Sequence, residues 1–206
     1  MMNSWTRRLR GWEGILLVML IVVLAYNITQ VPNFLTINNQ INLFQLGIEK
    51  AIVVLVMAFV IISGEIDLSV ASMMGLAAAT VAAMWETGAP MWLGILVALG
   101  VGAGFGLMNG FFVAKLGINS LAVTLAGYVG FRGLARLLVQ DRSVGDFPQW
   151  FNDLGQKGLI GPVTFSILVY AIGAVLATII LHQTGFGRRT YVIGSSAPVA
   201  RFSGVP

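Results

Sequence analysis

Two carboxylates stand between two long apolar runs in the stretch SGEIDLSVAS, residues 63–72. If Glu65 and Asp67 lie inside a membrane, they are candidates for a proton relay, because ionisable groups at membrane depth are functional candidates by default. A structural role is the alternative. Gly64 is a typical residue at a helix end, and Asp67 or Ser69 could accept the free N–H groups at the start of the next helix.

Other residues suited to catalysis or metal binding do not gather anywhere in the chain. There is no cysteine, and the single histidine, His182, has no neighbouring metal-ligating residues in the sequence and suits a polar helix end. The phosphate-binding pattern Gly-x-x-x-x-Gly-Lys-Ser/Thr does not occur. We therefore expect no catalytic residues, no cofactor site and no metal site, and no ATP hydrolysis by this chain.

The composition places the chain in a membrane. Of its 206 residues, 57% are hydrophobic and 10% are charged, and the mean hydropathy is +0.88. A water-soluble domain with a solvated exterior does not have such a composition. The net charge of +4 comes from basic residues scattered at segment ends, which indicates membrane topology and not a nucleic-acid surface.

Long apolar runs predict about six membrane helices, since about 20 apolar residues are needed to cross the hydrocarbon. They are expected near residues 12–28, 46–63, 68–86, 91–114, 120–140 and 163–184. The first run follows three arginines and also has the charge and length of a secretory signal, which is the alternative for residues 1–27. No small-x-small cleavage site follows it, so we expect an uncleaved helix. The predicted fold is an all-α, polytopic transmembrane bundle.

The basic residues predict the orientation of these spans. With a cytoplasmic N-terminus, alternation through the spans places most of them inside, as the positive-inside rule requires. They are Arg7, Arg8, Arg10, Lys115, Arg188, Arg189 and Arg201. Only Arg142 and Lys157 then lie in outside loops, while Lys50, Arg132 and Arg136 fall near outer helix ends, where long side chains can reach the headgroups.

Small and polar residues predict how the helices meet. Gly102, Gly106 and Gly110 share one face of a helix, as do Ala71, Gly75 and Ala79, and such faces are typical of close helix packing in membranes. Four polar residues inside or at the ends of the spans are expected to form hydrogen bonds between helices. They are Thr80, Asn109, Asn119 and Thr124.

The short linker at residues 64–67 has a second interpretation. Irregular backbone at membrane depth is tolerated where protein covers it or where it lines a water-filled path, and transporters use such breaks. The segment Gly64, Glu65, Asp67 and Ser69 is therefore a candidate for a broken helix in a translocation pathway.

Three motifs resemble one family of membrane proteins. SGEIDLSVASMMGLAAATVAA is similar to the segment GGIDLSVGS in the permease subunits of bacterial ABC sugar importers, the family of the ribose, xylose, rhamnose and autoinducer-2 systems. GLMNGFFVAKLGINSLAVTLAG resembles that family's helix end, short basic loop and following helix. TGFGRRTYVIGSSAPVARFSGVP resembles its cytoplasmic loop ending in AAR-SGI. The resemblance covers about residues 47–206.

Some positions depart from the family pattern. Glu65 and Ala71 stand where the family usually has glycine, Ser195 and Ser196 replace the last two residues of GGN, and Val199 replaces the first alanine of AAR. These departures prevent assignment of a particular sugar.

The resemblance implies transport without chemistry on the substrate. A periplasmic binding protein delivers a sugar, two identical or different permease subunits form the path through the inner membrane, and separate ATPase subunits bind and hydrolyse ATP. Family members are considerably longer, so we expect residues 1–206 to be the N-terminal part of a single permease domain and a fragment of a longer permease.

The resemblance also implies that residues 185–206 form a cytoplasmic coupling loop. Pro198 suits the first turn of a short helix with Ser196 or Ala197 before it, and small residues keep that helix slim enough for a groove of the ATPase. An interfacial amphipathic turn is the alternative. The expected coupling residues are Gly194, Pro198, Ala200, Arg201, Ser203 and Gly204.

Arg132 and Arg136 are four residues apart and so share a helix face. Snorkelling to the headgroups explains them. The functional hypothesis is that, with Arg142, they contact acidic residues of the binding protein.

Two rival functions remain open from the sequence. One is an ABC permease for branched amino acids or nucleosides, and the other is a proton-coupled secondary carrier that uses Glu65 or Asp67. The AR-SG motif disfavours the carrier, since a carrier has no ATPase to dock, and the IDLS segment favours sugars over amino acids.

Overall fold

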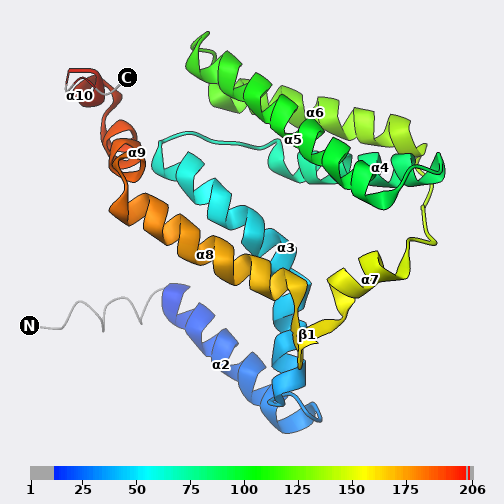
Figure 1. The fold of residues 1–206 in the computed structure, drawn as a ribbon. Coiled ribbons are helices and arrows are strands. Elements are labelled where there is room, and N and C mark those ends of the chain that lie inside the picture. The colour runs from blue at the N-terminus through cyan, green and yellow to red at the C-terminus, as the bar shows by residue number, and fades with distance from the viewer. Residues whose placement is uncertain (1–11, 203, 205–206) are drawn as a thin grey trace, which may run out of the picture. The chain divides into compact units, whose positions relative to one another are not determined.

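The computed structural model describes residues 12–202 and Gly204. The described chain is almost entirely helical (Figure 1). The long helices are α2 (Trp12–Gln30), α3 (Ile37–Ile62), α4 (Val70–Glu86), α5 (Met91–Ala114), α6 (Ser120–Val139) and α8 (Phe165–Gln183). The shorter elements are α7 (Gln149–Gln156), β1 (Gly158–Ile160), β2 (Val163–Thr164), α9 (Gly185–Ser195) and α10 (Ala197–Phe202).

The predicted spans are confirmed as helices. Five of the described helices are long and apolar enough to cross a membrane, namely α2, α3, α5, α6 and α8. The remaining predicted span is α4, which is apolar but has 17 residues. The helix α3 begins at Ile37, well before the predicted residue 46. Its polar first turns are helical because backbone hydrogen bonding continues beyond the apolar segment from which the span was predicted.

The chain divides between Gly47 and Ile48 into two units. In the first unit, α2 is followed by a tight turn in which Asn33 has a φ of 62°. The side chains of Asn39 and Gln40 both donate to the carbonyl oxygen of Phe34, at 2.8 and 2.6 Å, and so fasten the start of α3 to this turn. The predicted basic residues Arg7, Arg8 and Arg10 lie outside the described residues.

The second unit has its core where α4 packs against α5 and α6 (Figure 1). Leu76, Ala79 and Ala82 of α4 are buried there, together with Phe131 of α6. The rings of Phe131 and Phe105 have centroids 4.7 Å apart, which brings α6 and α5 together. Most of the buried side chains in this unit are therefore contributed by three consecutive helices.

The closest packing of helices involves glycines other than the predicted ones. A Cβ atom added to Gly127 would lie 3.2 Å from Cβ of Ser69, and one added to Gly94 would lie 3.4 Å from Cβ of Met84. By contrast, a Cβ atom at Gly102, Gly106 or Gly110 would meet nothing within 4 Å, and the same holds for Gly75. Within the described residues nothing packs against this glycine stripe, so its close packing stays a prediction.

A short α7 and a two-stranded antiparallel hairpin connect α6 to α8. Phe147 packs between two rings, with centroids 6.4 Å from Trp85 of α4 and 5.7 Å from Phe151 of α7. These elements were not predicted, since each is too short for hydrophobic periodicity to identify.

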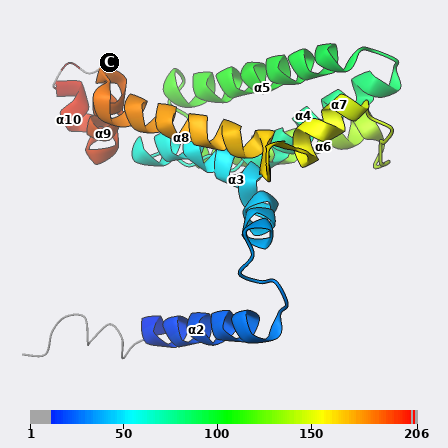
Figure 2. The same ribbon diagram turned by 60° about the horizontal axis from the view of Figure 1, so that its bottom comes forward.

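The helices α8 and α9 contact the second half of α3. A Cβ atom at Gly173 of α8 would lie 3.2 Å from Cδ1 of Leu55, and the rings of Phe59 and Phe186 are 6.2 Å apart. Figure 2 shows α8 leading into α9 and α10 at the C-terminal end. The hydroxyl of Thr184 accepts from the backbone N–H of Gly187 at 3.2 Å and so caps the start of α9.

Candidate functional site

The break between α3 and α4 is built around Gly64. This residue has a φ of +84°, a left-handed conformation that favours glycine, and its N–H donates to the carbonyl of Ile61 at 3.0 Å. The N–H of Glu65 donates to the carbonyl of Val60 at 3.1 Å. The prediction that Gly64 ends the second span is therefore confirmed.

The length of α4 indicates why this break matters in a membrane. Seventeen residues rise about 26 Å at ~1.5 Å per residue, which is shorter than the ~30 Å hydrocarbon core. A helix of this length would span the hydrocarbon only together with a few residues of the segment before or after it, whose polar groups would then need partners within the protein.

A chain of hydrogen bonds joins Asp67, Ser69 and Asn109. Oδ1 of Asp67 accepts from the backbone N–H of Ser69 at 2.8 Å and from its hydroxyl at 2.7 Å. Oγ of Ser69 in turn accepts from Nδ2 of Asn109 at 3.1 Å. Ser69 and Asn109 are both buried, with 3% and 7% of their surface exposed. The carboxylate thus fixes the direction of a network that links the start of α4 to α5.

The first turn of α6 fastens the same linker. Oγ of Ser120 accepts from the backbone N–H of Ile66 at 3.4 Å. The hydroxyl of Thr124 lies 3.4 Å from the carbonyl oxygen of Ile66, but its single proton is better placed to donate to the carbonyl oxygen of Ser120 in its own helix, at 2.7 Å. The backbone N–H of this linker residue therefore has a side-chain partner on α6.

The predicted polar contacts are confirmed only in part. Asn109 donates to Ser69 before α4. Thr124 donates mainly to Ser120 in its own helix at 2.7 Å, with the carbonyl oxygen of Ile66 in the linker at 3.4 Å. The prediction is wrong for Asn119, which caps its own helix by accepting from the N–H of Leu121 at 2.9 Å, and for Thr80, which donates within α4. Short side chains reach their own backbone more easily than a neighbouring helix.

The capping prediction for α4 is wrong, since neither Asp67 nor Ser69 accepts from an N–H group of the helix. Ser69 occupies the N-cap position, but its side chain makes no capping bond. Its hydroxyl is already engaged by Asp67 and Asn109. Asp67 accepts from the N–H of Ser69 itself, one residue before the helix. The side chain of Glu65 is exposed, so the structure does not bring the two carboxylates together into one buried site.

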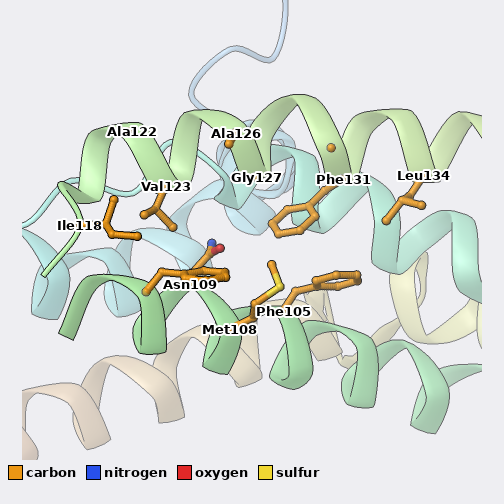
Figure 3. A pocket seen from close by; sticks show the side chains of 12 residues that line it. Phe105, Met108, Asn109, Ile118, Ala122, Val123, Ala126, Gly127, Phe131 and Leu134 are labelled. Atoms are coloured by element: carbon orange, nitrogen blue, oxygen red, sulfur yellow. The ribbon is translucent and has the colours of Figure 1, made fainter. Parts of the chain in front are cut away.

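Two cavities meet at Asn109. The larger one, about 660 Å³, lies between α5 and α6 and is lined by apolar side chains, among them Phe105, Met108 and Phe131. Figure 3 shows the amide of Asn109 reaching into it from α5. The smaller cavity, about 250 Å³, lies between α4 and α5 and is lined by Asp67 and Ser69 as well as Asn109. Polar side chains are therefore concentrated on the smaller cavity.

The predicted coupling residue Gly194 packs against the helix break. A Cβ atom added to Gly194 would overlap the carbonyl oxygen of Ile62, and the Cα of Gly194 lies 3.7 Å from the Cβ position of Gly64. The two segments are in backbone-to-backbone contact. No side chain other than hydrogen fits at position 194 without displacing α9 or the end of α3.

The short helix predicted around Pro198 is present as α10. Pro198 lies in its first turn, and Oγ of Ser196, just before the helix, accepts from the N–H of Val199 at 3.4 Å. Ala200 is buried, with 3% of its surface exposed. Gly204 has a φ of 72°. Ser203 and the side chain of Arg201 lie outside what the structure describes.

The three arginines of the predicted docking surface lie along the second half of α6 and just beyond its end. Arg132 donates to the hydroxyl of Tyr128 at 3.1 Å, Arg136 forms an ion pair with Asp141 at 3.4 Å, and Arg142 pairs with Glu86 at the end of α4, also at 3.4 Å. All three side chains are exposed.

His182 makes a local contact. Its Nδ1 lies 3.0 Å from the carbonyl oxygen of Thr178 in the preceding turn. Among residues 12–202 and 204, no group of three or more His, Cys, Asp or Glu side chains is placed to hold a metal ion.

The sequence did not indicate two of these relationships. The bond from Asn109 to Ser69 joins residues 40 positions apart, and the contact of Gly194 with Ile62 joins opposite ends of the second unit. An amide near the end of an apolar helix marked Asn109 as a polar group in need of a partner, but its partner could not be identified.

Comparison with known proteins relates the whole chain to transport permeases. The chain is 33% identical over 214 residues to the autoinducer 2 import system permease protein LsrD of Salmonella typhimurium strain LT2, covering 100% of this chain and 63% of the relative. It is 37% identical over 205 residues to the L-arabinose transport system permease protein AraH of Escherichia coli strain K12, covering 96% of this chain and 60% of the relative. No solved structure matches the chain.

The chain spans about three fifths of the length of these curated relatives. A family model described as "Branched-chain amino acid transport system / permease component" matches residues 39–206. This match includes the helix break, the polar network and the segment that contacts it. The chain therefore belongs to the family of branched-chain amino acid transport system permease components, a family of multi-pass transport proteins.

Proposed function

We propose that this chain is part of the permease subunit of an ATP-binding cassette importer that carries a monosaccharide or a similar small sugar across the inner membrane. The observation that carries the proposal is the similarity, over at least 95% of the chain, to permeases named for autoinducer 2 and L-arabinose import. A binding protein would deliver the sugar, and ATP would be bound and hydrolysed by a separate subunit. The permease would act as a homodimer or a heterodimer.

The proposed site of energy coupling is the segment 185–206, with α9 and α10. Its contact with the end of α3 supports this role, because a displacement of α9 cannot leave Gly64 undisturbed when the two backbones touch. Ala200 and Pro198 keep α10 narrow, as a helix that enters a groove of the ATPase must be. The other proposed coupling residues are Gly194, Arg201, Ser203 and Gly204.

The proposed translocation pathway passes the break formed by Gly64, Glu65, Asp67 and Ser69. The hydrogen bonds from Ser120 and Asn109 to this segment support the proposal, since they allow irregular backbone and a carboxylate to persist near membrane depth. The N-terminus would be cytoplasmic, which also places α9, α10 and the break on the same side.

The proposed docking surface for the binding protein is formed by Arg132, Arg136 and Arg142. Their exposure supports this role, and Arg136 and Arg142 lie near the end of α6, where they pair with Asp141 and Glu86. With the N-terminus inside, this end of α6 faces the periplasm, where a binding protein arrives.

The test is purification of the full-length permease from native membranes, followed by reconstitution with the proteins that accompany it. Uptake of radiolabelled L-arabinose, D-ribose, D-xylose and L-rhamnose is measured with and without ATP, with L-leucine as the competing candidate because of the family's description. We expect ATP-dependent uptake of one of the sugars, with an ATPase subunit among the accompanying proteins. Uptake of L-leucine alone, or uptake driven by a proton gradient without ATP, would contradict the proposal.

A further inference from the structure

The segment 140–164, which joins α6 to α8, stays on one side of the membrane. Both helices are long and apolar enough to cross it. The eight residues of α7 rise only about 12 Å at ~1.5 Å per residue, against ~30 Å of hydrocarbon. The helix α7 contacts β2 and α8 (Figure 1). It therefore lies either at the boundary between lipid and water or beyond it in the water.

A row of four aromatic rings connects α7 to the end of α4. The ring of Phe147 lies between those of Trp85 and Phe151, with centroids 6.4 and 5.7 Å away. The ring of Trp150 follows, 5.9 Å from that of Phe151. Trp85 and the charged Glu86 are the last two residues of α4. The row therefore holds α7 beside the point where the apolar part of α4 ends and charge begins.

The helix α7 has one apolar and one polar side. Trp150, Leu154 and Phe151 lie within one arc of about 100°, because successive residues of a helix are ~100° apart. The other side carries Gln149, Asn152, Asp153 and Gln156. Phe151 and Leu154 are half-buried against the chain, whereas Trp150 is 49% exposed. The chain itself therefore covers only part of the apolar side.

Tryptophans are concentrated at this end of α4 and α5. Trp85 lies in the last turn of α4, and Trp92, which is 59% exposed, is the second residue of α5. The linker before α4 and the loop between α5 and α6, at the opposite ends of these helices, contain no tryptophan. Tryptophan is enriched where a bilayer meets water, since its ring is apolar and its N–H can donate to a headgroup. The exposed Trp150 extends this group.

The exposed apolar side chains continue from α7 into a membrane span. Leu159 in the hairpin is 56% exposed, and Phe165, the first residue of α8, is 41% exposed. The helix α8 is long and apolar enough to cross the membrane, so lipid surrounds the exposed side chains that follow Phe165. The apolar side of α7 is therefore continuous along the chain with a surface that lipid covers.

We propose that α7 lies in the interface between lipid and water, with Trp150 among the phospholipid headgroups and the first carbons of the acyl chains and with the polar side of the helix in water. In the proposed orientation this is the periplasmic leaflet. The inference goes beyond the proposed function, because it names phospholipid as a partner of the connection between α6 and α8. It depends on the membrane spans and not on the transported solute.

Quenching of fluorescence by brominated lipid tests the position of Trp150. The full-length permease with its partner subunits is reconstituted in vesicles that contain phosphatidylcholine brominated either near the headgroup or near the ends of the acyl chains. The emission lost in Trp150→Phe is the contribution of Trp150. We expect shallow bromines to quench it at least about twofold more than deep bromines, as for an interfacial tryptophan.

A tryptophan placed in the hydrocarbon gives the matched control. Val129→Trp, made in the Trp150→Phe background, adds one halfway along α6 at a position that is 66% exposed. We expect the deep bromines to quench this tryptophan more strongly than the shallow ones.

Cysteine labelling is the second measurement, because the 206 residues contain no cysteine. Trp150→Cys and Gln156→Cys are compared in the reconstituted permease, with the original permease as background. Both positions are exposed in the chain, so a difference between them reports what surrounds it. A positively charged thiosulfonate reacts from water and enters the bilayer at a high cost. We expect it to modify position 156 at least about tenfold faster than position 150.

Three results would overturn the inference. The first is quenching of Trp150 by iodide in water and by neither brominated lipid, which would place α7 in the periplasm, where the binding protein could contact it. The second is stronger quenching of Trp150 by deep than by shallow bromines. The third is equal modification of the two thiols. Sugar uptake tests the proposed function separately, since neither quenching nor labelling requires transport.

Discussion

Nδ2 of Asn109 on α5 donates a hydrogen bond to Oγ of Ser69, which precedes α4, at a distance of 3.1 Å. Both side chains are buried. Because Ser69 also donates to Asp67, the serine hydroxyl is the centre of the network that joins the helix break to its neighbour.

Ser69→Ala should therefore destabilise the permease by about 1–3 kcal/mol, since it leaves the amide of Asn109 buried without an acceptor. The matched variant is Thr80→Val, which removes an equally buried hydroxyl whose hydrogen bond lies within α4. We expect a smaller loss for Thr80→Val, measured by thermal unfolding in the same detergent. Equal losses would mean that the bond between Ser69 and Asn109 contributes nothing specific.

Gly127→Ala and Gly130→Ala should shift stability in opposite directions. A Cβ atom at Gly127 would lie 3.0 Å from Cε2 of Phe131 and 3.2 Å from Cβ of Ser69, whereas one at Gly130 would meet nothing within 4 Å. Alanine is favoured over glycine in a helix by about 1 kcal/mol, but overpacking costs about 1–3 kcal/mol. The melting temperature should fall for Gly127→Ala and rise for Gly130→Ala. A rise for both would show that α6 can move away from Ser69 at no cost.

Gly194→Ala should uncouple ATP hydrolysis from uptake. The added methyl group would overlap the carbonyl oxygen of Ile62, so α9 must move away from the end of α3. Gly185→Ala is the control in the same helix, since its nearest neighbour would be the end of the Arg188 side chain at 3.8 Å. We expect sugar uptake per ATP hydrolysed to fall at least about tenfold for Gly194→Ala only. If the Gly194→Ala variant takes up as much sugar per ATP hydrolysed as the original permease, the contact between α9 and the end of α3 does not couple ATP hydrolysis to transport.

Reversing Arg132 and Arg136 to glutamate should weaken binding of the periplasmic protein about tenfold or more at low salt, with a smaller effect at high salt, because screening reduces interactions between exposed charges. Stability should change by less than about 1 kcal/mol, as is usual for exposed ion pairs. Binding is measured on the reconstituted permease by surface plasmon resonance. Lys115→Glu with Arg189→Glu controls for total charge. If both double variants weaken binding equally, the arginines are not the docking surface.

The sequence allowed prediction of the helices because membrane spans are defined by one quantity, the length of an apolar run. It failed to predict α7 and the hairpin at Gly158–Ile160 and Val163–Thr164, since elements of two to eight residues carry no usable periodicity. It also placed the start of α3 too late, because hydropathy follows the apolar segment and not the backbone hydrogen bonds.

The candidate site could be predicted only as a set of residues. The motif drew attention to Gly64 and Asp67, and the short helix around Pro198 was expected from its local sequence. The contacts of Asn109 with Ser69 and of Gly194 with Ile62 depend on how helices far apart in sequence approach each other. The glycine stripe shows the same limit, since small residues at Gly102 and Gly106 are compatible with close packing and with open space alike.

The meeting of Gly194 with Gly64 has a mechanical consequence. Side chains at an interface can change rotamer and so absorb part of any displacement, but two glycines have no rotamers. The contact between these two residues is made by backbone atoms, which cannot adjust by a change of rotamer. If α9 moves toward α3, the end of α3 must therefore move with it, because no side chain lies between the two backbones.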